Sequence, residues 1–136
     1  MKPLAPLAVA LLLGACSAAP PVGTCPAGLA PQIEAHLYFG LTSVGGVPIP
    51  EADWTDFVAR EVTPRFPDGL TVIDTTGQWR DRTGSHVVRQ PSRVIVIDTD
   101  PGPATLAKLQ AIRDAYRARF HQQSVGLTTT ELCAGF

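Results

Sequence analysis

The chain has 136 residues, of which 45% are hydrophobic and 17% are charged, and this size suits one globular domain better than two. Eleven Lys and Arg residues nearly balance twelve Asp and Glu residues, so the formal net charge is −1. A chain this close to neutral lacks the basic excess of a nucleic-acid-binding protein, and we expect no nucleic-acid partner.

The first segment is typical of an export signal. Lys2 supplies a positive charge, and the apolar run at 4–13 that follows is too short to span a bilayer. The run ends in Leu-Gly-Ala-Cys at 13–16, which resembles the cleavage motif of a bacterial lipoprotein. That resemblance implies removal of residues 1–15 and attachment of a lipid to Cys16, which would anchor the protein in a membrane of the cell envelope, in the periplasm or on the outer surface. Secretion without a lipid and a true membrane span are the alternative interpretations.

Residues 16–33 combine the lipidated N-terminus with a linker rich in Pro, Ala and Gly. If Cys16 carries a lipid, Cys25 and Cys133 remain as an even pair in an oxidising compartment, and we predict a disulfide between them. Two free thiols are the alternative. No His or Cys stands at zinc-like spacing from either thiol, so we expect no metal and no cofactor.

The folded domain is predicted over 34–136 and begins with a strand and a helix. The run at 35–42 is rich in aromatic and aliphatic residues and stops at a Gly-containing turn, as a strand does. The segment 50–64 predicts a helix, because Pro50 suits its first turn and Trp54, Phe57, Val58 and Val62 share one face.

Strands at 70–79, 93–99 and 124–132 and a helix at 100–120 are predicted in the second half of the chain. Asp100 is the candidate cap of this helix, and its apolar stripe is expected at Leu106, Leu109, Ile112, Tyr116 and Phe120. The stretch 80–92 is predicted to be a loop or the tip of a long hairpin, with residues 86–88 as a candidate strand extension.

The element order β-α-β-β-α-β predicts an α+β, ferredoxin-like fold with a four-stranded antiparallel sheet and two helices on one face. The expected strand order of 4-1-3-2 brings the end of the last strand near the start of the first, which is compatible with the predicted disulfide. The other face of this sheet has too few polar side chains to be fully solvated. We therefore expect it to be covered by a second copy in a homodimer, or to hold a ligand cleft.

The stretches EVTPRFPDGLTVIDTTGQWRDRTG, SRVIVIDTD and SVGLTTTELCAGF resemble a bacterial family described only as a domain of unknown function, DUF3574. The resemblance covers about 35–136. Members of this family look like short exported proteins that often carry a lipoprotein signal. The resemblance implies the domain and its export, and it brings no activity and no catalytic residues.

A group of polar, basic and aromatic residues forms a candidate pocket for an anionic ligand. Arginine binds carboxylate and phosphate groups through paired hydrogen bonds, an aromatic ring offers a stacking surface, and histidine offers a proton near neutral pH. The alternative is a solvated hairpin whose arginines pair with helix acids. The candidate residues are Tyr38, Arg65, Gln78, Trp79, Arg80, His86 and Arg89.

These observations favour a binding or structural module of the cell envelope over an enzyme. The sequence contains no nucleophile elbow, no Gly-rich phosphate loop and no acid pair at a convincing spacing, so no catalytic residue is assigned. The expected partners are a membrane reached through the lipid, a second copy, and an anionic ligand or an envelope protein. A small cofactor-independent enzyme acting on an anionic small molecule is the alternative function.

Overall fold

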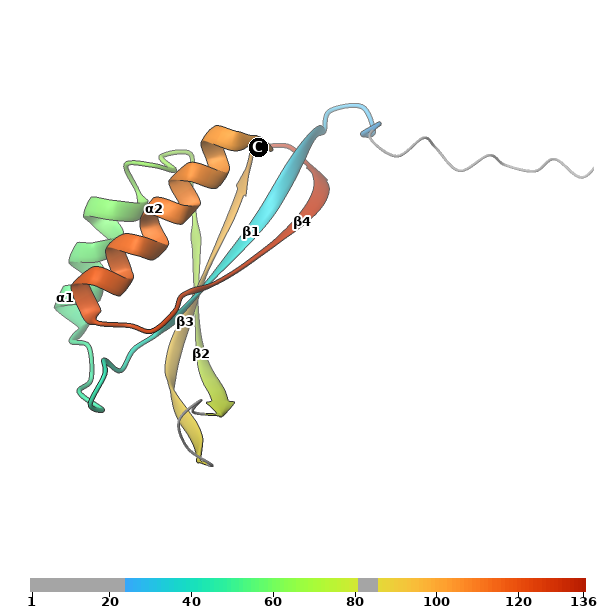
Figure 1. The fold of residues 1–136 in the computed structure, drawn as a ribbon. Coiled ribbons are helices and arrows are strands. Elements are labelled where there is room, and N and C mark those ends of the chain that lie inside the picture. The colour runs from blue at the N-terminus through green and yellow to red at the C-terminus, as the bar shows by residue number, and fades with distance from the viewer. Residues whose placement is uncertain (1–23, 81–85) are drawn as a thin grey trace, which may run out of the picture.

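The computed structural model describes residues 24–80 and 86–136 (Figure 1). The sheet has the strand order β2-β3-β1-β4 with antiparallel neighbours, and α1 and α2 lie on one of its faces (Figure 1). This arrangement confirms the predicted ferredoxin-like fold. The elements are β1 (Ala30–Gly40), α1 (Glu51–Phe57), the π-helical turn η1 (Val58–Val62), β2 (Thr71–Arg80), β3 (Val87–Thr99), α2 (Pro103–Phe120) and β4 (Gly126–Ala134).

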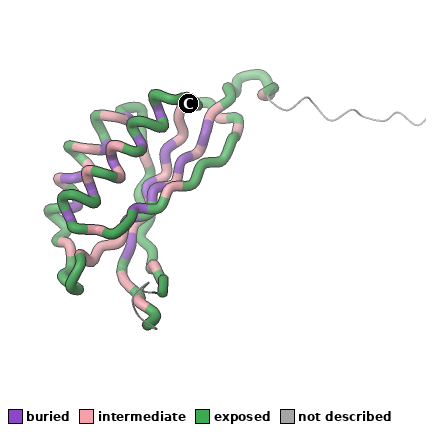
Figure 2. The backbone as a smooth tube through the Cα atoms, in the orientation of Figure 1, coloured by how far each residue is buried: buried purple, intermediate pink, exposed green. Residues whose placement is uncertain are grey.

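The core lies between the sheet and the helix layer (Figure 2). Strand β1 alternates strictly, with Ala35, Leu37 and Phe39 fully buried toward the helices and Tyr38 exposed on the other side. Ile95 of β3 lies directly opposite Leu37 and is also fully buried. The helix-covered face is therefore the packed face, and no described helix or strand covers the face that carries Tyr38.

Aromatic rings fill the centre of this core. The ring centroid of Tyr116 lies 4.7 Å from that of Phe39 and 4.9 Å from that of Phe57, in edge-to-face contacts. The Tyr116 hydroxyl donates a hydrogen bond of 2.8 Å to the Gly40 carbonyl oxygen, so its polar end is satisfied inside the core. These contacts join α1, α2 and the end of β1.

Two details of the helices differ from the sequence predictions. The prediction that Asp100 caps α2 is wrong, because the N-cap position is Gly102, which makes no side-chain cap hydrogen bond, and Pro103 at the first helical position has no N–H to satisfy. Leu106 is also not in the core. It is 50% exposed, and Thr105 occupies the buried position at this end of the stripe.

Strands β1 and β3 begin earlier in the chain than predicted. β1 begins at Ala30, inside the predicted linker, and pairs there with Ala134 of β4. β3 begins at Val87 and continues through Pro91, so the described part of the predicted 80–92 loop is mostly strand. Pro91 lies beyond the last β1–β3 pair, Gly40 with Ser92, so β1 needs no N–H from it, and its carbonyl accepts a hydrogen bond from the Leu41 N–H.

Cys25 and Cys133 form a disulfide with a Cα–Cα distance of 5.6 Å, as predicted. The bond joins the residues just before β1 to β4, at the end of the sheet where these two strands pair. Cys16 lies outside the described residues.

Candidate functional site

The sheet face that points away from α1 and α2, called the open face here, carries an apolar row across three strands. Ile73 of β2 is in register with Val94 of β3, and Val94 is in register with Tyr38 of β1, so the three side chains stand next to one another on the same face. Ile73 is 48% exposed and Tyr38 is 43% exposed. This row leaves large apolar side chains in water at the middle of the sheet.

Tyr38 extends the apolar row over the neighbouring strand β4. Its register partner there is Gly126, and a Cβ atom on Gly126 would come within 3.1 Å of the Tyr38 ring. The absence of a side chain at Gly126 therefore lets the ring lie across β4. The result is a broad, shallow apolar surface, and any larger residue at position 126 would push the ring outward.

One end of the open face is acidic. Glu34 of β1 is in register with Asp98 of β3, and the carboxylate of Glu34 lies 2.9 Å from Nε2 of His36. Asp98 Oδ1 and Gln32 Oε1 are buried and have no hydrogen-bond partner among the described residues. The described open-face positions, which alternate along each strand, contain no Lys and no Arg. An anionic ligand would therefore meet neither Lys nor Arg from the described strands on this face.

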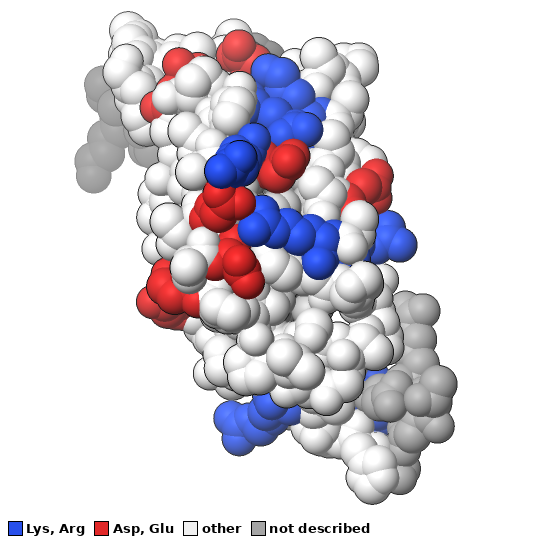
Figure 3. Space-filling model, turned by 90° about the vertical axis from the view of Figure 1, so that its left-hand side faces the viewer, with Lys and Arg blue, Asp and Glu red and all other residues white. Residues whose placement is uncertain are grey.

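The opposite side of the molecule carries a band of charged groups, several of which form ion pairs with one another. Figure 3, which faces the side where the helices lie, shows basic and acidic side chains in contact. Arg119 donates to Asp56 at 2.9 Å, and Arg60 also donates to Asp56. The hydrogen bonds from Arg60 and Arg119 hold the pKa of Asp56 below its ordinary value. Asp56 of the helix layer is thus already paired with two arginines.

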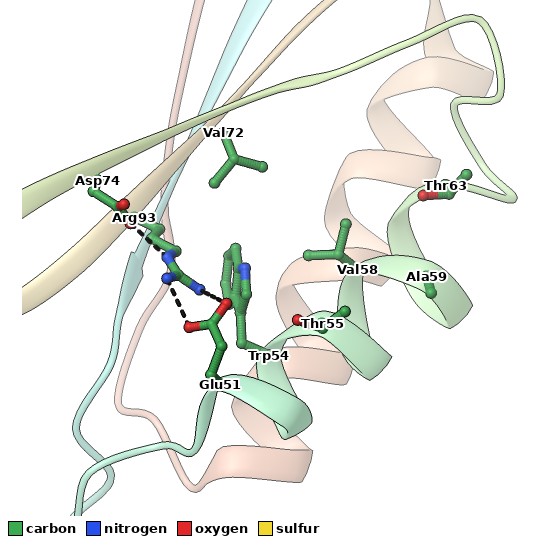
Figure 4. Close-up of a pocket in the computed structure, with 9 residues that line it drawn as sticks. All are labelled: Glu51, Trp54, Thr55, Val58, Ala59, Thr63, Val72, Asp74 and Arg93. Carbon is green, nitrogen blue, oxygen red and sulfur yellow. Dashed lines mark hydrogen bonds and ion pairs between the residues drawn. The ribbon is translucent and has the colours of Figure 1, made fainter.

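A groove between α1 and β2 encloses about 450 Å³, and its polar end is built around Arg93 (Figure 4). The Arg93 guanidinium donates two hydrogen bonds to Glu51, at 2.8 and 3.0 Å, and one of 2.7 Å to Asp74. It also lies 5.2 Å from the ring centroid of Trp54. The hydrogen bonds that Arg93 donates to Glu51, and then the one to Asp74, raise the pKa of Arg93. Because its donors face two carboxylates, Arg93 fixes α1 to the sheet and is not free to hold an anion.

A second cleft of about 450 Å³ lies at the acidic end of the sheet. Asp68, Asp98 and Asp100 line it together with Phe66 and Phe136. Within residues 24–80 and 86–136, no three or more His, Cys, Asp and Glu side chains are grouped in a way that could hold a metal ion. The cleft is therefore acidic and partly aromatic without forming a metal centre.

The candidate pocket residues on the β2–β3 hairpin lie on opposite faces. Trp79, like Tyr38, is on the open face, whereas Gln78 and Arg80 are on the other face, because successive side chains of a strand alternate. Arg89 is in register with Gln78, so the structure does bring these two together.

The remaining candidate residues lie elsewhere. Arg65 follows η1 and forms a 2.9 Å ion pair with Glu61, and His86 is exposed just before β3. None of the seven residues predicted for the anion pocket lines either of the two clefts described above. The anion pocket stays a prediction, with its members in several places on the surface.

Three apolar residues of the open face were not identified from the sequence as site residues: Ile73, Val94 and Val96. Their signal is the register across strands: Val94 and Val96 of β3 face away from the helices, and Ile73 of β2 lies beside Val94. A single strand in the sequence shows the alternation and not its neighbours, so the row becomes visible only after pairing.

Comparisons with known proteins give a family and a fold. A model of the family described as "Protein of unknown function (DUF3574)" matches residues 34–136. A phage SAM lyase, in a structure with S-methyl-5'-thioadenosine, is 17% identical over 77% of this chain and 90% of that chain, with a TM-score of 0.61. Its apo structure is 21% identical over 78% and 90%, with a TM-score of 0.56.

CutA from Synechococcus elongatus PCC7942 is 10% identical over 76% of this chain and 80% of that chain, with a TM-score of 0.49. A comparison with curated proteins returns no match. At such identities the phage enzyme shows the fold alone. Among the described residues, no helix is both long enough and apolar enough to cross a membrane.

Proposed function

The chain belongs to the DUF3574 family, and we propose that it is a lipid-anchored protein of the bacterial cell envelope whose open face binds another envelope protein. The observation that carries this proposal is the apolar row of Ile73, Val94 and Tyr38, in which Ile73 and Tyr38 are exposed and Val94 is half-buried between them. Exposed apolar patches of this kind mark interaction surfaces, because leaving them in water costs free energy that a partner recovers. The partner therefore presents apolar side chains to the sheet.

A protein partner fits the charges of the open face better than an anionic small molecule does. Glu34 and Asp98 place negative charge at one end of the row, and the arginines of the hairpin, Arg80 and Arg89, project from the opposite face. The alternative function, a small enzyme acting on an anionic substrate, would need basic groups beside the apolar row. The likeness to the phage SAM lyase supplies the fold and no residue for such a site.

Export and anchoring are supported by the use of the three cysteines. Cys25 and Cys133 are joined in a disulfide, and structural disulfides persist in oxidising compartments outside the cytoplasm. The remaining Cys16 follows an apolar run and the small residues Gly14 and Ala15, the pattern expected of a lipid acceptor. A thioether-linked diacylglycerol provides two chains, which suffices for stable anchoring.

Photocrosslinking in the intact envelope tests the binding face. A benzoylphenylalanine in place of Tyr38 is expected to crosslink to a different envelope protein, identified by mass spectrometry. The same probe in place of Leu106, an exposed apolar residue on α2, is the matched control and should give no such product. Val94→Asp, which puts a charge in the middle of the row, should abolish the Tyr38 crosslink. Equal crosslinking from both positions, or none from Tyr38, would reject the open face as the binding surface.

A further inference from the structure

Strand β2 (Figure 1) forms one edge of the sheet and is exposed along almost its whole length. Every residue of β2 except Gly77 is exposed, and the strand carries three large apolar side chains in water: Val72, Ile73 and Trp79, at 41%, 48% and 43% exposure. Its sequence TVIDTTGQWR contains neither Pro nor Lys, the residues that most often protect an edge strand from pairing, and its two charged residues, Asp74 and Arg80, have opposite signs. β2 therefore offers a long edge with little protection against another strand.

We propose that β2 pairs with β2 of a second copy of this chain, antiparallel about a two-fold axis at Thr76, and joins two four-stranded sheets into one sheet of eight strands. The pairing uses the backbone edge of β2, and it is independent of what binds the open face. The other edge strand, β4, is part of the described structure and carries no large exposed apolar side chain. Pairing at β2 therefore buries more apolar surface than pairing at β4 would.

The sequence of β2 is complementary to itself in this register. A two-fold axis perpendicular to the sheet keeps the open faces of both copies on the same side, so residues whose numbers add to 152 lie opposite each other. Ile73 then faces Trp79 of the partner subunit on the open face. Pairs of an aromatic and a β-branched residue directly opposite each other are among the favourable cross-strand contacts.

The other face of β2 is complementary in charge and hydrogen bonding. In the same register, Asp74 lies opposite Gln78 of the partner subunit and diagonal to Arg80 of the partner subunit, within reach of a long side chain. No described residue forms an ion pair with Arg80 within one copy. A second copy supplies the carboxylate that Arg80 lacks, which favours this chain as its own partner.

The pairing also makes the open face continuous. The apolar row of Tyr38, Val94 and Ile73 is extended across the seam by Trp79 of the partner subunit, and the two-fold axis repeats this on the other side. The dimer thus carries two apolar rows on one uninterrupted surface.

Disulfide trapping tests the register. Thr76 is expected opposite Thr76 of the partner subunit, with the two Cα atoms about 4.5–5.5 Å apart, which is within the range of a disulfide. In the full chain carrying Cys16→Ser, Thr76→Cys should form a covalent dimer on mild oxidation at micromolar concentration. Thr130→Cys on β4, an exposed Thr on the other edge strand, is the matched control and should stay monomeric on a non-reducing gel. Equal trapping of both variants, or no trapping of Thr76→Cys, would overturn the proposal.

Light scattering tests the interface without a crosslink. The full chain with Cys16→Ser should have the mass of two copies at tens of micromolar. Trp79→Asp places a charge opposite Ile73 of the partner subunit and is expected to weaken association at least tenfold. Leu106→Asp removes a similarly exposed apolar residue from α2 and should leave the mass unchanged. Any parent mass other than that of two copies contradicts the two-fold pairing, whereas the crosslink from Tyr38 to an envelope protein reports on the open face separately.

Discussion

Arg93 on β3 and Glu51 at the start of α1 are joined by a two-pronged ion pair across 42 residues of sequence, with hydrogen bonds of 2.8 and 3.0 Å. The Arg93 side chain is only 14% exposed and also contacts Asp74 and the Trp54 ring. Glu51 lies in the first turn of α1, where a negative charge is favourable to the helix dipole. The pair therefore fixes the orientation of a short helix on the sheet.

Arg93→Ala is expected to lower the free energy of unfolding by about 2–3 kcal/mol, because it removes charge-assisted hydrogen bonds and leaves Trp54 uncovered. Urea unfolding measures this loss. The control is Arg117→Ala, which breaks an exposed i,i+3 pair with Asp114 and should cost less than about 0.5 kcal/mol. Similar losses in the two variants would show that Arg93 has no special structural role.

The Cys25–Cys133 disulfide should contribute a large share of the stability, because it joins residues separated by 108 positions. In the loop-entropy model, closing a loop of this length stabilises the folded state by about 4–5 kcal/mol. Replacing both cysteines by Ser in the Cys16→Ser chain should shift the urea midpoint down accordingly. A reductant should lower the urea midpoint of the Cys16→Ser chain to that of the variant without the two cysteines, and it should not change the midpoint of that variant. An unchanged midpoint in the reduced parent would contradict this prediction.

Lipid attachment at Cys16 predicts that the native protein partitions with membranes and that Cys16→Ser releases it into a soluble fraction, since two acyl chains supply the anchor. Globomycin, which blocks lipoprotein signal cleavage, should cause the precursor to accumulate in the parent. Normal maturation in the presence of globomycin would favour the alternative of ordinary secretion. Cys25→Ser is the matched control and should leave membrane partitioning unchanged.

The fold could be predicted because its signals are local. The alternation of Leu37, Tyr38 and Phe39 identifies β1 and its two faces, and the aliphatic run around Ile95 identifies a central strand. The pairing of Cys25 with Cys133, inferred from the number of cysteines, is compatible with a strand order that places the first and last strands side by side. These features depend on neighbours in sequence or on simple geometry.

Strand lengths and helix starts could not be predicted, because they depend on pairing and backbone details. Pro91 argues against a strand, but it lies beyond the last β1–β3 pair, Gly40 with Ser92, where its carbonyl accepts from the Leu41 N–H. Asp100 has the chemistry of a cap, but the chain turns at Gly102 with φ of 157° and the helix starts after it. Propensity identified the helix and not its first residue.

The candidate pocket illustrates a different limit. Gln78, Trp79 and Arg80 are adjacent in sequence, and adjacency in a strand sends alternate side chains to opposite faces. The apolar row of Ile73, Val94 and Tyr38 instead comes from three strands and is assembled only by register. A surface built across strands is the kind that composition and spacing do not reveal.

The buried phenol of Tyr116 leads us to expect a loss of folding stability at alkaline pH. Burial raises the pKa of its phenol above the ordinary value of about 10, although the positive charge of Arg93 acts in the opposite direction. The neutral phenol is favoured in the folded state, where it donates to Gly40 and packs against Phe39. Its contribution is therefore complete below about pH 10, and it falls as the pH rises above the unfolded-state pKa.

Tyr116→Phe separates this effect from the hydrogen bond. Below about pH 9 the variant should be less stable than the parent by about 1 kcal/mol, because the Gly40 carbonyl loses its donor. Above about pH 10 the parent should lose stability more steeply than the variant, so the gap between them narrows or reverses. Urea unfolding of both proteins from pH 8 to 11 measures the two slopes, and subtracting one curve from the other removes the effect of other groups. Parallel curves would contradict the prediction, since they would mean that Tyr116 ionises equally easily in the folded and unfolded chains.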